Sequence, residues 1–276
     1  MDPSDLIEEH GADATRYGLL KMSSTQDVRF SVGAIEEGRK LANKLWNVSR
    51  LILANVGDAL PEIRPRGIEE RWILARIDAA RAEIERAIAA FEFSAATSTL
   101  YHLTFDDFCD WYLEAVKARL YEGDDDARAT ALAALERLLK LLHPAMPHVT
   151  EEIWSNLPQR DTRLIVAPWP EPDDRFAADA DALERVQIAA PIFRRSQVTV
   201  PMEEDERRIF EAVVRPDRVK GNGNAALEID RLSKEVERAE KMLANERFVA
   251  KAPPDVVEAE REKLDRYRRE LDALAG

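Results

Sequence analysis

The sequence predicts a mainly α-helical protein, built as a helical bundle, an irregular connecting segment and a C-terminal antiparallel coiled-coil hairpin. Three observations lead to this fold class. Apolar residues recur at three- and four-residue steps through most of residues 35–142, a heptad stripe follows in residues 229–274, and Pro and Gly mark the breaks between stretches. A chain of 276 residues is long enough for one or two cores and an appendage.

The heptad stripe is the clearest pattern in the chain. It has two parts, separated by the segment 245–254, which ends in Pro253 and Pro254. Residues three and four apart share one side of a helix, so two such stripes joined by a short turn can pack together. The spacing alone is equally compatible with a dimerising coiled coil. The stripe residues are Ile229, Leu232, Val236, Ala239 and Leu243, then Val257, Leu264, Tyr267, Leu271 and Leu274.

The N-terminal two thirds predict a series of helices with chemically marked ends. Residues 2–16 form two short helices hinged at Gly11, and further helices are expected over residues 35–53, 69–90, 94–121 and 127–142. Gly123 ends one helix, and the Asp124–Asp126 run caps the next. A magnesium site at these aspartates is the alternative, but nothing near them in sequence completes an oxygen cage.

After Pro158 the helical pattern weakens. Residues 176–224 are expected to be irregular, with a short β-like stretch at 197–200 and a flexible joint at 221–224. Helix resumes in the hairpin.

Composition limits the function. The 40 Lys and Arg residues against 53 Asp and Glu give a net charge of −13, which argues against indiscriminate binding to polyanions. The single cysteine, Cys109, predicts neither an internal disulfide nor a zinc site. No apolar run approaches a membrane span, and the acidic N-terminus does not resemble an export signal. We therefore expect a cytoplasmic monomer without a membrane contact.

One predicted helix departs from this acidic character. Its polar side carries a local positive strip, and such a strip neutralises phosphates without reading sequence, while neighbouring amides can hydrogen-bond bases or sugars. On charge alone a solvated surface with Trp46 in the core is the better interpretation. The candidate residues on this helix are Arg39, Lys40, Asn43, Lys44, Trp46, Asn47 and Arg50.

The densest aromatic stretch is residues 105–117. Aromatic side chains near Lys117 are suited to stacking on unpaired bases. Aromatics at helical spacing are more often core, so we expect Phe108, Trp111 and Tyr112 to divide between packing and exposure.

Several ordered motifs resemble those of bacterial valyl-tRNA synthetases. They are DPSDLIEEHGADATR at the N-terminus, QDVRF, GRKLANKLWN, DDFCDWYLEAVK, LLHPAMPHVTEEIW, APWP and, at the hairpin tip, LANERFVAKAPPDVVEAEREKL. The tip favours the hairpin over a dimerising coiled coil. The stretch 176–223 departs from the family pattern, because relatives commonly have a longer segment there.

The resemblance implies four regions. Residues 1–30 correspond to the stem-contact region after the catalytic domain, 31–175 to the anticodon-binding bundle, 176–224 to a divergent connector and 225–276 to a C-terminal tRNA-binding arm. It implies tRNA(Val) as partner, and the catalytic portion of the synthetase as a second candidate partner. Besides the residues of the positive strip and Lys117, it points to Arg247, Phe248, Lys251, Arg261 and Lys263 as tRNA-binding residues.

The catalytic and editing parts of such an enzyme are not recognisable in these residues. Lys21 to Thr25 looks like the ATP-binding loop of the family but follows the elements that the loop should precede, so we interpret it as a decoy. We therefore expect no catalytic residues, no bound metal and no cofactor in this chain, with ATP and Mg²⁺ belonging to the full-length enzyme. Two alternatives remain: a helical protein-interaction scaffold derived from a synthetase fragment, and, with little weight, an autonomous enzyme using Lys21.

Overall fold

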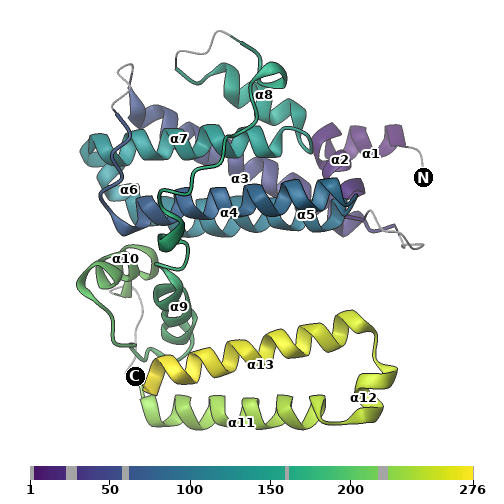
Figure 1. Cartoon of the computed structure of the whole chain (residues 1–276), viewed down its shortest axis with the longest axis vertical. Coiled ribbons are helices and arrows are strands. Elements are labelled where there is room, and N and C mark those ends of the chain that lie inside the picture. Colours follow the sequence, from purple (N-terminus) through teal and green to yellow (C-terminus); the bar gives the residue numbers. More distant parts are fainter. Residues whose placement is uncertain (1–2, 23–29, 58–61, 159–161, 217–222, 276) are drawn as a thin grey trace. The chain divides into compact units, whose positions relative to one another are not determined.

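The computed structural model describes residues 3–22, 30–57, 62–158, 162–216 and 223–275, and most of these residues are helical (Figure 1). It divides into two compact units, residues 1–182 and 183–276. Among the described residues there is no β-strand. The predicted fold class, mainly α with a bundle and a C-terminal hairpin, is confirmed.

The first unit contains eight α-helices among its described residues, one π-helical stretch and two short 3-10 turns. The α-helices are α1 (Pro3–His10), α2 (Ala12–Lys21), α3 (Val32–Val56), α4 (Ile68–Ala89), α5 (Phe93–Tyr101), α6 (Leu113–Glu122), α7 (Asp125–Leu142) and α8 (Pro147–Ser155). The π-helix spans His102–Tyr112 between α5 and α6, and the 3-10 turns span Leu164–Val166 and Ala177–Asp179.

The core of this unit forms where α3 and α4 pack against α7. Leu45 and Ile52 of α3, Ile77 of α4 and Leu138 of α7 are fully buried, so the apolar side of each amphipathic helix faces the bundle centre. Within the aromatic stretch, Phe108 and Tyr112 are buried and Trp111 is half-buried, as expected.

The N-terminal helices pack tightly on α3 because two glycines permit it. A Cβ at Gly18 would lie 2.9 Å from the Ile35 backbone nitrogen, and a Cβ at Gly38 would meet the Tyr17 ring at 2.7 Å. Larger residues would separate α2 from α3. The predicted hinge at Gly11 is confirmed, with φ of 91° between α1 and α2.

Two further sequence predictions are resolved at helix ends. Gly123 ends α6 in the left-handed conformation, and the Asp124 carboxylate accepts a hydrogen bond of 2.9 Å from the Ala127 amide at the start of α7. Capping therefore explains this aspartate. Helix α8 begins at Pro147, because proline suits a first helical turn.

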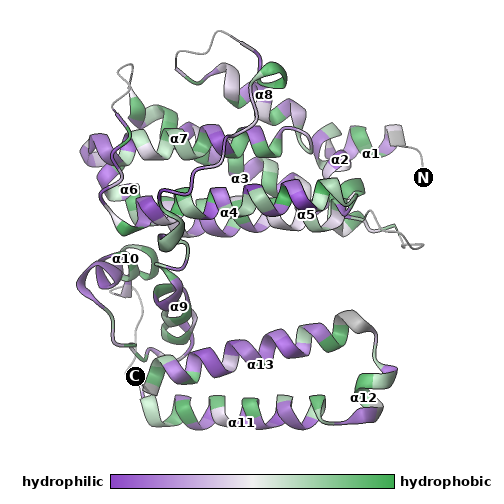
Figure 2. Ribbon diagram, in the orientation of Figure 1, coloured by the Kyte–Doolittle hydropathy of each residue, from purple (hydrophilic) through white to green (hydrophobic). Residues whose placement is uncertain are grey.

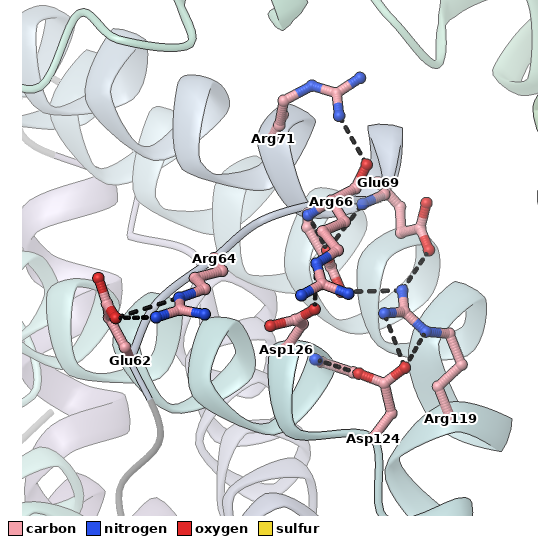
Figure 3. Close-up of polar contacts among 11 residues, drawn as sticks. Glu62, Arg64, Arg66, Glu69, Arg71, Arg119, Asp124 and Asp126 are labelled. Atoms are coloured by element: carbon pink, nitrogen blue, oxygen red, sulfur yellow. Dashed lines mark hydrogen bonds and ion pairs between the residues drawn. The ribbon is translucent and has the colours of Figure 1, made fainter.

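A charged cluster joins α4, α6 and the start of α7 (Figure 3). Arg119 contacts the carboxylates of Glu69 at 3.0 Å, Glu70 at 2.8 Å and Asp124 at 3.0 Å. Both glutamate side chains are completely buried, and burial raises the pKa of Glu70. Glu70 also accepts hydrogen bonds from the amides of residues 66 and 67 at the start of α4, so this cluster fixes the helix end as well as its packing.

The second unit contains α9 (Glu184–Ser196), α10 (Glu204–Val214), α11 (Ala225–Leu243), α12 (Glu246–Lys251) and α13 (Pro254–Ala275). The connector is therefore more regular than expected, with two helices that pack together through Phe193 and Phe210. The β-like stretch 197–200 forms no strand in the described structure, and its first residue, Gln197, ends α9 in the left-handed conformation with φ of 60°. Its valines are buried against the unit, which accounts for the β-like pattern.

The hairpin formed by α11 and α13 is antiparallel, with α12 at its tip (Figure 1). Leu232, Ala239, Val257 and Leu264 are buried along the seam, whereas Ile229 remains 38 % exposed. Figure 2 shows how hydrophilic most of α13 is outside this seam. Each of the two helices has only a narrow apolar stripe. Pairing of α11 with α13 therefore buries most of the apolar surface of both helices.

Candidate functional site

The first candidate site is a groove of about 580 Å³ between α3 and α8. Trp46, Asn47 and Arg50 line it from α3, and Glu152, Ile153 and Asn156 line it from α8 and the residue after it. Three of the residues predicted from the α3 sequence thus share one concavity.

The side chains at this groove are arranged for contact with a ligand. Trp46 is 37 % exposed and therefore lies at the surface. The interpretation from charge alone, which placed Trp46 in the core, is wrong. Asn47 and Arg50 are exposed, and neither makes a side-chain hydrogen bond or ion pair with a described residue. An aromatic face, an amide and a guanidinium together can stack on and hydrogen-bond a flat polar group.

The other residues of the α3 strip differ in whether their side chains already have a partner. Arg39, Lys40 and Asn43 are exposed and unpaired with respect to the described residues. Lys44, by contrast, forms a 2.6 Å ion pair with Asp110, and its ammonium lies 3.3 Å from the centre of the Phe105 ring. Both partners belong to the π-helix, so Lys44 contributes to packing of α3 against that element.

Lys117 is also paired. It is half-buried on α6 and contacts the Glu114 carboxylate at 2.8 Å one turn earlier. Lys117 is not among the residues that line the groove between α3 and α8.

The predicted arm residues lie at the tip and along α13. Lys251 is exposed at the end of α12 and Phe248 is half-buried there, while the side chain of Arg247 lies outside the described residues. Arg261 and Lys263 are exposed and pair with Glu258 and Glu260 at 3.2 and 3.1 Å. The two partners of each pair lie one helical turn apart, and the cations are exposed to solvent. Such pairs are weak, so another anion can replace the carboxylate.

Two groups of residues were not identified from the sequence. The α8 residues of the groove follow α3 by about a hundred positions in the chain, and no local spacing signals that they meet. The second is Arg195 of α9, which contacts Glu228 and Glu270 at the base of the hairpin, each at 2.7 Å. Glu228 and Glu270 are 5 % and 2 % exposed, and because this burial appears only in the tertiary structure, no local sequence pattern points to Arg195 as their partner.

Electrostatics at these positions follow from the contacts. Hydrogen bonds from Arg231 and then from Arg195 lower the pKa of Glu228, which therefore stays ionised at neutral pH. Burial raises the pKa of Cys109 to about 12, so this thiol remains protonated and unreactive. Lys21, the candidate for an ATP role, pairs with Glu37, and the rest of its loop through residue 29 lies outside the described residues. No described helix is long and apolar enough to cross a lipid bilayer.

Two family models match the chain. Residues 70–210 match the anticodon-binding domain of tRNA ligases, and residues 226–276 match the valyl-tRNA synthetase tRNA-binding arm. The second match coincides with the hairpin of α11, α12 and α13.

Curated relatives agree with these models. The valine–tRNA ligase of Geobacillus kaustophilus (strain HTA426) is 34 % identical over 339 residues, covering 99 % of this chain and 38 % of the relative. That of Bacillus subtilis (strain 168) is 32 % identical over 338 residues, with the same coverage of 99 % and 38 %. The chain thus spans well under half the length of these relatives.

A solved structure shares the fold. The crystal structure of the ternary complex of Agrobacterium radiobacter K84 agnB2 LeuRS, tRNA and LeuAMS aligns with a TM-score of 0.52 at 22 % identity, covering 64 % of this chain and 21 % of that one. At this identity the likeness concerns the fold alone. Taken with the two matched regions and the curated relatives, the helical bundle and hairpin show that the chain belongs to the valyl-tRNA synthetase family and carries its anticodon-binding domain and tRNA-binding arm.

Proposed function

We propose that this chain binds tRNA, and specifically tRNA(Val), with the groove between α3 and α8 receiving bases of the anticodon loop. The observation that carries the proposal is the meeting of Trp46, Asn47 and Arg50 in one exposed concavity, whose α8 side lies within the region that matches the anticodon-binding domain. Single-stranded bases are recognised by stacking on aromatic or guanidinium planes and by hydrogen bonds to their edges, and these three side chains supply both.

The unpaired cations of α3 support the same function. Arg39 and Lys40 precede the groove residues on the same helix, and both are exposed. With a net charge of −13, the chain as a whole repels RNA, so such local cations must supply the attraction to phosphates.

Within this proposal the chain recognises tRNA for the ligase reaction named by its relatives, the ATP-dependent attachment of valine to tRNA(Val). It uses no cofactor of its own, and ATP and Mg²⁺ act elsewhere in the full-length enzyme. The chain by itself binds tRNA without charging it. It acts in the cytoplasm as a monomer, together with a catalytic portion of the synthetase.

The test is binding of the purified chain to tRNA(Val) and to a transcript with an altered anticodon, at low and moderate salt. We expect preference for the native anticodon and an affinity that falls as salt rises, since cations on the protein displace counterions from phosphates. Arg50→Ala should weaken binding about tenfold, as loss of a contact to a base costs roughly 1–3 kcal/mol.

Arg194→Ala is the matched control, because it removes an exposed arginine that lies on α9, outside the groove. Equal affinity for both anticodons, unaffected by Arg50→Ala, would contradict base recognition in the groove. Absence of any tRNA binding would instead favour the protein-interaction scaffold.

A further inference from the structure

The arm is slightly acidic overall, with 13 Asp and Glu against 11 Lys and Arg in residues 225–276. An RNA-binding surface on it must therefore arise from how these charges are distributed. The buried seam residues, Leu232 and Ala239 on α11 and Val257 and Leu264 on α13, mark the contact line between the helices. Side chains that flank this line on either side form two opposite faces of the hairpin.

On α11 the two flanks carry opposite charges. Successive residues are rotated by about 100° around a helix, which places Arg231 and Arg238 on one flank of the Leu232 seam. The same rotation places Glu237 and Glu240 on the other flank. The contacts agree, because Arg231 interacts electrostatically with Glu270 of α13 and Glu240 pairs with Arg268 of α13 at 2.8 Å.

Those two interhelical contacts fix which flank of α13 belongs to which face. Glu270 shares its flank with Arg266 and Lys263, one and two turns earlier. Arg268 shares its flank with Arg261, Asp265 and Asp272. We define the basic face by Arg231, Lys234, Arg238, Lys263 and Arg266, and the acidic face by Glu237, Glu240, Glu258, Asp265 and Asp272.

The cations of the two faces also differ in their availability. Arg238 and Arg266 on the basic face are exposed and form no ion pair with any described residue, although Arg266 lies over the Tyr267 ring. On the opposite side Arg261 pairs with Glu258, Arg268 with Glu240 and Arg269 with Glu184 of α9. On the basic face Arg231, Lys234 and Lys263 are also paired, with Glu228, Asp230 and Glu260. The difference between the faces therefore rests on Arg238 and Arg266, whose guanidinium groups are exposed and unpaired among the described residues.

Arg195 strengthens this difference. Glu228 and Glu270 lie along the basic face at its base, and Arg195 contacts both carboxylates, while Arg231 contacts Glu228 at 2.8 Å. These buried carboxylates are therefore compensated within the protein and do not offset the exposed arginines. Glu235, near the seam on the same side, is half-buried.

We propose that the arm binds RNA through its basic face, with Arg238 and Arg266 contacting the sugar–phosphate backbone and the acidic face turned away. The proposal rests on the function proposed above and adds the face that makes the contact. The exposed guanidinium groups of Arg238 and Arg266 suit phosphates, because arginine forms paired hydrogen bonds to them. Of the two α13 residues predicted from the sequence, Lys263 lies on the basic face, and Arg261 lies on the acidic one.

The decisive comparison uses two double variants of the full chain. Arg238→Ala with Arg266→Ala removes one cation of the basic face from each helix, and Lys241→Ala with Arg268→Ala removes from each helix one cation that pairs with a glutamate of the acidic face. Both change the net charge equally. We expect the first pair to weaken tRNA(Val) binding and to reduce the slope of log affinity against log salt by about 2, since each phosphate contact contributes about 0.9. The second pair should leave both quantities unchanged.

Circular dichroism of both double variants establishes that the helices are intact. Equal effects of the two pairs, or a larger effect of Lys241→Ala with Arg268→Ala, would overturn the assignment of the basic face. Such a result leaves the proposed function standing if Arg50→Ala still weakens binding. Failure of the unaltered chain to bind tRNA would overturn both proposals.

Discussion

Single residues in this protein derive their roles from the burial of their partners. Arg119 is the clearest case, because it faces two glutamates that are completely buried and an aspartate that caps α7 (Figure 3). An arginine in this position neutralises charges that water cannot reach. Lys44 shows the same principle nearer the surface. The sequence assigned Lys44 to RNA binding, but its ammonium pairs with Asp110 and lies over the Phe105 ring.

Arg119→Met should destabilise the first unit by about 3–5 kcal/mol, since it leaves Glu69 and Glu70 buried without a countercharge. Urea unfolding followed by circular dichroism measures this change. Arg66→Met is the control within the same cluster, because the Arg66 side chain is 74 % exposed in its pair with Asp126 and should contribute less than about 1 kcal/mol. Equal destabilisation by the two variants would show that the burial of the glutamates is not what matters.

The helices of the arm depend on each other as elements. Helix α13 is mostly hydrophilic, and α11 alternates between hydrophobic and hydrophilic residues (Figure 2). Among the described residues the two helices pack mainly against each other, and α13 also contacts α9. Helices of this length are marginal in isolation, and their stability comes from packing of the apolar stripe.

Leu232→Asp combined with Leu264→Asp should melt the hairpin, because it places two unpaired carboxylates in the seam. The measurement is the loss of helix signal in circular dichroism, equivalent to most of residues 225–275. Leu227→Asp combined with Val256→Asp is the control, since these residues lie on the same two helices but are 67 % and 44 % exposed. If helicity survives the seam variant, the antiparallel pairing is wrong.

At the scale of the whole molecule, the chain consists of two units with separate cores and separate ionic clusters. Arg119 stabilises the first, and Arg195, through Glu228 and Glu270, stabilises the second. The two family models also fall largely in different units. The anticodon-binding match begins in the first unit and ends at residue 210, and the arm match lies entirely within the second unit.

Calorimetry should therefore resolve two unfolding transitions. Arg119→Met is expected to lower the temperature of one transition, and Arg195→Ala that of the other, because each variant leaves buried carboxylates uncompensated within one unit only. Arg194→Ala, which removes the exposed neighbour of Arg195, should shift neither. A single transition that both variants lower equally would show that the two units unfold as one.

The sequence by itself determined the helices through residue 142 and those of the hairpin, their main breaks, the hinge at Gly11, the cap at Asp124 and the seam of the hairpin. These features depend on periodicity and on contacts between residues a few positions apart, which a single sequence displays directly. It also located the α3 residues of the groove, because a basic strip in an acidic chain is visible without a structure.

Only the tertiary structure decided which of those residues are available and what they meet. The α8 side of the groove, the pairing of Lys44 with Asp110 and the contacts of Arg195 join residues far apart in the chain, so no local pattern encodes them. The helices of the connector were missed because buried valines at 198 and 200 imitate a strand. The two charged faces of the arm likewise appear only once the antiparallel packing sets one helix against the other, since charge patterns on a single helix do not show which flanks will share a face.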